Sequence, residues 1–168
     1  GGSIPTSPLQ MRVEPIEFGW ARELNMLWHS TLPRFGTGFV QSQPFLSFAA
    51  TYDGLIYAIA IWSNPVARNL PQREWLELRR QAHAPDVPKN TGSWMLGVMT
   101  RLIRRERPFV KRLISYQDTI AHRGIIYCAA GWIPTIINLD GNWTRRKRQR
   151  PEAQSRAPKQ RWELVLRR

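Results

Sequence analysis

Four consecutive residues in the second half of the chain combine a hydroxyl, a phenol, an amide and a carboxylate. They are Ser115, Tyr116, Gln117 and Asp118. They end a short apolar run that is typical of a buried strand, and polar groups at strand ends commonly line a ligand site in α/β proteins. Ser115, Tyr116 and Asp118 are therefore candidate catalytic residues, and Tyr127 on the next segment is a fourth. The alternatives are that Asp118 caps a helix and that Tyr127 is an ordinary core residue.

A second polar segment, Lys89-Asn90-Thr91-Gly92-Ser93, stands between a predicted strand and a predicted helix. A helix N-terminus presents unpaired backbone N–H groups and the positive end of the helix dipole. Small residues let a phosphate approach these groups. The segment therefore predicts a pyrophosphate site formed by Lys89, Asn90, Thr91, Gly92 and Ser93. An ordinary capped helix is the alternative, because the segment matches neither a P-loop nor a dinucleotide-binding fingerprint.

Net charge is the strongest signal in the composition. The chain holds 25 Lys plus Arg against 12 Asp plus Glu, which gives +13 at pH 7. Such a charge indicates a polyanionic partner, although solubility alone is an alternative reading. Residues 143–161 are basic and lack an apolar run, so they predict an extended arm that contacts DNA phosphates. Its candidate DNA-binding residues are Arg145, Arg146, Lys147 and Arg148, with Trp143 as a stacking partner for a base.

Apolar periodicity predicts the elements that would position these residues, in a domain of the α/β (α+β) class. Helices are predicted at 13–32, about 93–105 and about 120–130, the last capped by Thr119 and ended by Gly131. Strands are predicted at 45–50, 55–62, 75–80, 112–116 and 162–166, with a hairpin turn at Asp53-Gly54. The run 55–62 is nearly continuously apolar, which is typical of a strand buried on both faces.

The length of 168 residues favours one domain. Gly1 to Ser3 are expected to be a cloning remnant, and the domain is expected to span residues 4–168. Cys128 is the single cysteine, so an internal disulfide is excluded, which suits the cytoplasm. No apolar run of about 18 residues is present, so no membrane span is expected.

The strand, loop and helix around Gly92 resemble the acyl-CoA pyrophosphate loop of GNAT acetyltransferases. The family pattern is Gln/Arg-x-x-Gly-x-Gly/Ala; this chain departs from it, with one glycine and with Trp94 where a small residue is usual. The segment from Tyr127 to Gly131-Trp132 is similar to a later motif of the family, in which a Tyr precedes Gly-Phe by four residues. The resemblance implies a GNAT-like fold with a mixed central sheet flanked by helices. It also implies acetyl-CoA or another acyl-CoA as cofactor, and Tyr127 as the acid that protonates the CoA thiolate.

A narrower resemblance, over residues about 65–163, is to the Mom-type branch of bacteriophage DNA-modification proteins. It rests on an ordered set of segments: Pro65 to Arg68, Leu76 to Arg80, Pro88 to Asn90, Leu113 to Asp118, His122-x-Gly124, Ile126-Tyr127 and Pro158 to Glu163. The resemblance implies an enzyme that modifies the exocyclic amine of adenine in phage DNA and so protects it from restriction. The alternatives are an N-acetyltransferase for a small amine or a protein N-terminus, and an inactive basic DNA-binding module.

The same resemblances suggest further site residues. An ordinary GNAT reaction passes the amine proton to a carboxylate or a water chain, which makes Glu77 a candidate base; its alternative is pairing with an arginine. His29 corresponds to a histidine near the active site of the Mom-type branch. We expect Tyr116, Asp118 and Tyr127 to face one crevice with His29 at its edge. A metal ion is a weaker hypothesis, because His29, His83, Asp118 and His122 have no metal-ligand spacing and no ligand is assigned.

Overall fold

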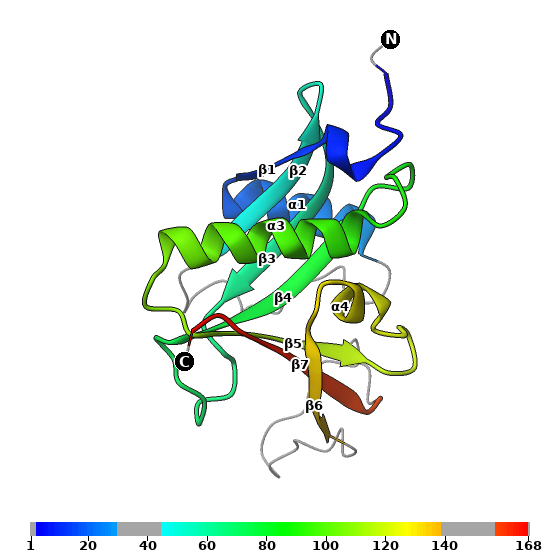
Figure 1. Cartoon of the computed structure of the whole chain (residues 1–168). Helices are drawn as coiled ribbons and strands as arrows, with labels where there is room; N and C mark the ends of the chain where they lie inside the picture. Colours follow the sequence, from blue (N-terminus) through cyan, green and yellow to red (C-terminus); the bar gives the residue numbers. More distant parts are fainter. Residues whose placement is uncertain (1–2, 30–44, 139–156, 168) are drawn as a thin grey trace.

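The structure is a computed structural model that describes residues 3–29, 45–138 and 157–167. Within these ranges, strands form one seven-stranded sheet in the order β1-β2-β3-β4-β5-β7-β6 (Figure 1). The strands are β1 (Arg12–Pro15), β2 (Leu46–Tyr52), β3 (Leu55–Ser63), β4 (Trp75–His83), β5 (Arg112–Asp118), β6 (Ile133–Asn138) and β7 (Lys159–Val165). The pairing of β4 with β5 is parallel, and the other neighbouring strands are antiparallel. The predicted mixed α/β class is confirmed.

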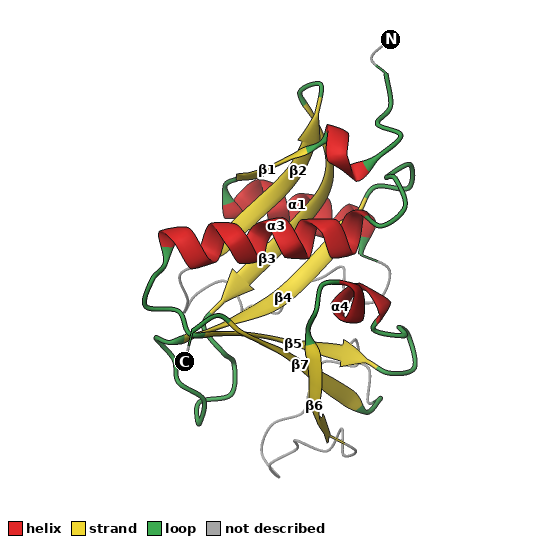
Figure 2. Ribbon diagram, in the orientation of Figure 1, coloured by secondary structure: helices red, strands yellow, loops and turns green. Residues whose placement is uncertain are grey.

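Helices cover both faces of this sheet (Figure 2). The chain begins with the short helix η1 (Pro8–Gln10), and α1 (Phe18–Trp28) packs on one face. The opposite face carries α3 (Thr91–Glu106) and the short α4 (Ile125–Ala129). Among the described residues, no helix combines the length and the apolar character needed to cross a membrane.

The core follows from alternation along β3, because successive side chains of a strand point to opposite faces. Ala58, Ala60 and Trp62 pack toward α3, while Ile59 and Ile61 pack toward α1. Residues 57–63 are all buried, so the predicted strand with two buried faces is confirmed. Its predicted hairpin is also confirmed: Asp53 and Gly54 both have positive φ, at 49° and 74°, as a two-residue type I′ turn requires.

A β-bulge in β4 shapes the middle of the sheet. Ile61 pairs with Arg80 and Trp62 pairs with Leu78, so Arg79 is the extra residue of the bulge. A bulge bends the strand that carries it and increases its twist. The parallel pairing of β4 with β5 ends at Leu78 and Ser115, next to this bulge. Figure 1 shows the two strands diverging from this region.

The predicted helix at 13–32 is wrong at its start. Arg12–Pro15 forms β1, which pairs with β2, and the helix begins only at Phe18. The apolar spacing was also misleading, since Trp20 and Leu27 are 64% and 74% exposed. The fully buried residues of α1 are Ala21 and Asn25, so small size rather than hydrophobicity marks the face that meets the sheet.

The predicted helix at 120–130 is shorter than expected. It covers Ile125–Ala129 and follows Gly124, which has a positive φ of 70°. Thr119 is not its cap, because the Thr119 hydroxyl donates to the carbonyl of Pro158.

The strand β6 was not predicted, and β7 begins at Lys159 rather than Trp162. The end of the predicted basic arm, residues 159–161, therefore lies in the sheet. The helix at 93–105 and the strands at 75–80 and 112–116 are confirmed as parts of α3, β4 and β5.

Candidate active site where β4 and β5 separate

A chain of hydrogen bonds lies where the pairing of β4 and β5 ends. The Tyr127 hydroxyl is 2.9 Å from Ser115 Oγ, and Ser115 Oγ donates to the Leu78 carbonyl over 3.2 Å. Because the single proton of Ser115 is used on Leu78, Tyr127 must donate to Ser115 in this arrangement. Burial raises the pKa of Tyr127 above its usual 10, so the phenol is protonated at neutral pH. The arrangement keeps the Tyr127 phenol protonated at the point where β4 and β5 separate.

The ring of Tyr127 is fixed by two tryptophans. It stacks on Trp162 with ring centroids 5.4 Å apart and meets Trp132 at 5.6 Å. The Trp162 indole N–H donates to Gln117 Oε1 over 2.7 Å, and the Gln117 amide donates to the carbonyl of His122. Gln117 thus ties β5, β7 and the connection to α4 together on the Tyr127 side of the sheet.

The first turn of α3 lies beside this group and has unpaired donors. Within the described chain, the backbone N–H groups of Gly92 and Ser93 have no acceptor, and Asn90 provides no side-chain cap. The packing is close: a Cβ on Gly92 would be 3.0 Å from Ile126 of α4 and 3.2 Å from His83. Asn90 has a φ of 66°, which turns the chain into the helix. The first turn of α3 thus presents backbone donors at which an anion could bind, and the predicted pyrophosphate site stays a prediction.

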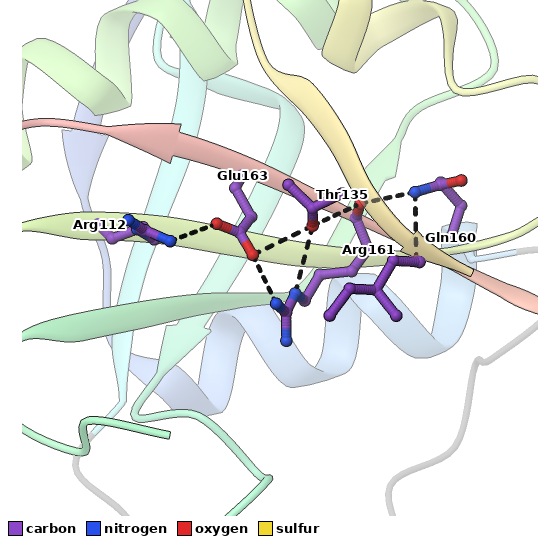
Figure 3. Close-up of polar contacts among 6 residues, drawn as sticks. Arg112, Thr135, Gln160, Arg161 and Glu163 are labelled. Atoms are coloured by element: carbon purple, nitrogen blue, oxygen red, sulfur yellow. Dashed lines mark hydrogen bonds and ion pairs between the residues drawn. The ribbon is translucent and has the colours of Figure 1, made fainter. Parts of the chain in front are cut away.

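The opposite face of the same strands carries a second polar group (Figure 3). The buried Glu163 carboxylate lies between Arg112 Nη1 at 2.6 Å and Arg161 Nη2 at 2.7 Å, and it accepts from Thr135 Oγ1 over 3.1 Å. Arg161 also hydrogen-bonds Tyr116. The Arg112 guanidinium in turn lies over the Trp75 ring, 4.5 Å from its centroid. These contacts join β4, β5, β6 and β7, and Tyr116 takes part in them through Arg161.

The two tyrosines therefore lie on opposite faces of β5. Ser115 and Tyr116 are neighbours in a strand, so their side chains point to opposite sides of the sheet. Ser115 contacts Tyr127 on the α3 side, and Tyr116 contacts Arg161 on the other side. The prediction that Tyr116, Asp118 and Tyr127 face one crevice is wrong in this respect.

Glu77 and Asp118 also lie on the Tyr116 side of the sheet and have partners. Glu77 is buried; it accepts from the Val66 N–H over 2.9 Å and pairs with Arg79 at 3.4 Å. Burial raises the pKa of Glu77, and the nearby Arg79 opposes that effect. Asp118 pairs with Lys159 at 2.7 Å and accepts from the N–H groups of Ile120 and Ala121. Asp118 thus holds the turn after β5 and does not cap a helix, because α4 begins only at Ile125 after Gly124.

His29 is a neutral base at physiological pH. It ends α1, where its N–H donates to the Asn25 carbonyl over 2.9 Å. Burial lowers the pKa of His29 to about 4, with the positive charge of Arg80 and the neighbouring His122 and His83 acting in the same direction. Residues of β4 and of the connection after β5 thus contribute to the low pKa of His29. In the described ranges, however, no group of His, Cys, Asp or Glu is arranged to hold a metal ion.

The low pKa of His29 predicts a pH dependence of folding stability. An unfolded histidine takes up its proton near pH 6.5, whereas folded His29 stays neutral until about pH 4. Protons therefore favour the unfolded chain as the pH falls from 6.5 toward 4, and the stability present above pH 6.5 is lost. Between pH 7 and pH 5, the parent should lose about 1 kcal/mol more free energy of unfolding than His29→Gln, after discounting for partial exposure. Urea unfolding at both pH values measures this, and equal losses in the two proteins would contradict it.

Several residues of this region were not predicted to be site residues from the sequence. Gln117, Trp162, Arg161 and Glu163 all contribute, and their contacts join positions far apart in the chain. The alternation of β7 was the available signal, because Arg161 and Glu163 share one face and Trp162 takes the other. The predicted DNA-binding residues Trp143, Arg145, Arg146, Lys147 and Arg148 lie outside the described residues.

The sequence matches the model of a protein family. The family model described as the Mom protein family matches residues 56–161, which is more than half of the chain. This range includes β3 to β6 and most of the polar groups described above. A search of curated protein sequences found no match.

Solved structures share the fold at low sequence identity. An acetyltransferase from Bacillus subtilis, in complex with CoA, has a TM-score of 0.65 and 11% identity over 92% of this chain and 98% of its own. Spermidine N-acetyltransferase from Vibrio cholerae, in complex with CoA and spermine, has a TM-score of 0.64 and 8% identity over 94% of this chain and 96% of its own. A protein from Desulfovibrio desulfuricans assigned to the GNAT family of acetyltransferases has a TM-score of 0.63 and 12% identity, over 93% and 99%. The predicted GNAT-like fold is confirmed.

Proposed function

This chain belongs to the Mom protein family, and from that premise we propose that it uses acyl-CoA to modify the exocyclic amine of adenine in DNA. The observation that carries the proposal is the pair of unpaired N–H groups, of Gly92 and Ser93, beside the point where β4 and β5 separate. An anion bound there would direct its attached chain toward Ser115 and Tyr127. The solved structures with the same fold include complexes with CoA, which agrees with this cofactor.

In the proposed arrangement the residues Lys89 to Ser93 hold the CoA diphosphate. The helix dipole of α3 adds a favourable potential to the two free N–H groups, and Lys89 adds a positive charge at the exposed entrance. Acyl-CoA supplies a thioester-activated acyl group when bound. The fit rests on donors for which the described residues provide no acceptor, and on the absence of a Cβ at Gly92.

The Tyr127 hydroxyl is proposed as the proton donor for the leaving thiolate. After transfer, the hydroxyl hydrogen of Ser115 can turn from the Leu78 carbonyl to the phenolate oxygen, since both acceptors lie within hydrogen-bond distance of Ser115 Oγ. That bond stabilises the charged form of Tyr127 and partly offsets the effect of burial. Ser115 therefore assists Tyr127 without exchanging a proton with solvent.

The acceptor amine is proposed to approach from the other face of the sheet, where Tyr116, Glu77 and neutral His29 lie. The adenine amine is a weak nucleophile, and a neutral His29 or a water held by Glu77 can accept its proton. A base in a duplex must be flipped out to reach such a site, which costs a few kcal/mol. The Tyr116 ring and Trp143 are candidates for stacking on the extruded base.

DNA binding is proposed to rest on the basic segment with Arg145, Arg146, Lys147 and Arg148. The total charge of +13 suits a surface that follows phosphates. Exposed Arg101, Arg104 and Arg105 on α3 are the alternative contact surface within the described chain. The site of action would be the cytoplasm of a bacterial host.

Mass spectrometry of nucleosides tests the proposal. DNA isolated from bacteria that express the parent should contain a modified deoxyadenosine, and Ser93→Asp should abolish or strongly reduce it. Asp at this third helical position is favourable for α3 itself, yet it places a negative charge beside the diphosphate. Calorimetry should therefore show CoA affinity reduced about tenfold or more at an unchanged melting temperature.

Ser93→Asn is the matched control, because it has the shape of Asp without the charge and should lose much less affinity. Unmodified DNA together with turnover of acyl-CoA on small amines would favour the N-acetyltransferase alternative. DNA binding without any CoA binding would favour an inactive DNA-binding module. Both outcomes would contradict the proposed function.

A further inference from the structure

Among the described residues, the side-chain nitrogen of Gln81 has hydrogen-bond partners and its side-chain oxygen has none. Its Nε2 donates to the Gly92 carbonyl over 3.1 Å and lies 3.4 Å from His83 Nε2. Its Oε1 is buried, and no donor in the described part of the chain reaches it. A buried carbonyl oxygen without a donor is rare in native proteins and calls for an explanation.

Rotating the amide does not remove the unsatisfied oxygen. The rotated form would bring Oε1 against the Gly92 carbonyl oxygen, and two acceptors repel each other. His83 supports the same orientation, because burial lowers the pKa of His83 and keeps the ring neutral, so Nε2 can accept from Gln81. The position of Oε1 therefore follows from its neighbours.

Gln81 also lies on the path between the two halves of the proposed site. It follows the bulge at Arg79, on the part of β4 that has no pairing with β5, and its side chain is on the α3 side with Gly92. At 3.3 to 3.4 Å per residue, Gln81 is roughly 10 Å along β4 from Leu78, where the Tyr127 and Ser115 group begins. Gln81 therefore lies along β4 between the residue that pairs with Ser115 and the start of α3.

We infer that Gln81 Oε1 accepts a hydrogen bond from an amide N–H of the pantetheine arm of acyl-CoA. The inference rests on the proposed function only for the identity of the cofactor. The pantetheine arm carries two secondary amides between the diphosphate and the sulfur, so it offers donors along this path. Gln81 then positions the arm through Oε1, while the bond from Nε2 to the Gly92 carbonyl fixes the orientation of the amide.

Calorimetry with two ligands tests this assignment. The ligands are CoA and 3′-phosphoadenosine 5′-diphosphate, which keeps the diphosphate and lacks the pantetheine arm. Gln81→Met should weaken CoA binding about tenfold and change binding of the shorter ligand less than about twofold. Gln72→Met removes a glutamine whose amide donates to the carbonyls of Ala67 and Leu70, away from Gly92 and Ser115 in the chain, so it should leave both affinities unchanged.

A modified ligand makes the test independent of how the variant folds. A CoA analogue with the pantetheine amides replaced by esters has no N–H donors, and it should bind the parent about tenfold more weakly than CoA. Equal loss of both ligands in Gln81→Met would mean that Gln81 acts only on the loop, and equal affinity of CoA and the ester analogue would mean that Oε1 contacts water only. Either result overturns the inference. CoA binding that responds to Gln81 while host DNA stays unmodified would instead refute the DNA-modifying function and leave this assignment standing.

Discussion

Replacing Tyr127 by Phe is expected to lower the rate of acyl transfer about 100-fold while the fold and the affinity for CoA stay close to those of the parent. The ring keeps its stacking on Trp162 and its contact with Trp132, and only the hydroxyl is lost. Ser115 retains the Leu78 carbonyl as its acceptor, so no buried donor is left unpaired. The cost to folding should therefore be about 1 kcal/mol. Single-turnover release of CoA thiol, with DNA as acceptor, measures the rate.

Tyr52→Phe is the control for this experiment. The Tyr52 hydroxyl bonds to Ser3 at the surface, so its removal should leave the rate unchanged. The pH profile gives a second readout, because a proton donor is lost only when the pH exceeds its pKa. Burial raises the pKa of Tyr127 above 10, so an activity loss caused by its ionisation must lie above pH 10. A Tyr127→Phe rate within a few-fold of the parent would assign Tyr127 to the core alone.

Replacing Gly124 by Ala is expected to destabilise the protein by about 3 kcal/mol. Two effects combine, since Gly124 has a φ of 70°, and an added Cβ would be 2.5 Å from Gln117 Oε1 and 2.6 Å from the Trp162 ring. Neither neighbour can move freely, because Trp162 donates to Gln117 and stacks on Tyr127. Urea unfolding monitored by circular dichroism gives the free energy.

Gly131→Ala separates the two effects. Gly131 has a similar φ of 79°, but nothing lies within 4 Å of the position of its added Cβ. This variant should therefore show the backbone cost alone, about 1 kcal/mol. Equal destabilisation by the two substitutions would mean that the contact of Gly124 with Gln117 and Trp162 is unimportant. The remaining folded fraction of Gly124→Ala should also have a lower transfer rate, because Trp162 positions Tyr127.

Much of the central sheet was predictable because its strands carry a strong local pattern. The continuous apolar run of β3 and the Asp53-Gly54 turn determine a hairpin without help from the rest of the chain. β1 and β6 lack such a pattern: β1 contains Pro15, and β6 exposes Ile133, Ile136 and Ile137. β1 and β6 are the two edge strands of the sheet, and they form because they pair with neighbouring strands. The local sequence pattern does not reveal such pairing.

Those features of the candidate site that depend on one helix or strand alone were predictable from the sequence. The N–H groups in the first turn of α3 and the nearness of Ser115 to the α4 segment are of this kind. The Gln117 and Trp162 contact joins residues 45 positions apart, so it depends on the pairing of β5 with β7. The separation of Tyr116 from Tyr127, in contrast, follows from strand alternation and was available in the sequence.

The extra residue in β4 changes which of its residues face α3. Before Arg79, the even-numbered residues Leu76 and Leu78 face α3; after it, the odd-numbered residues Gln81 and His83 do, and Ala82 turns toward α1. A chain that lacked Arg79 would keep every other side chain of β4, yet the residues after the bulge would exchange the two faces of the sheet. Gln81 and His83 would then leave the α3 side, and Ala82 would replace them next to Gly92. When relatives are aligned, a single-residue gap in β4 is therefore a change of chemistry, and it carries more information than most substitutions in the same strand.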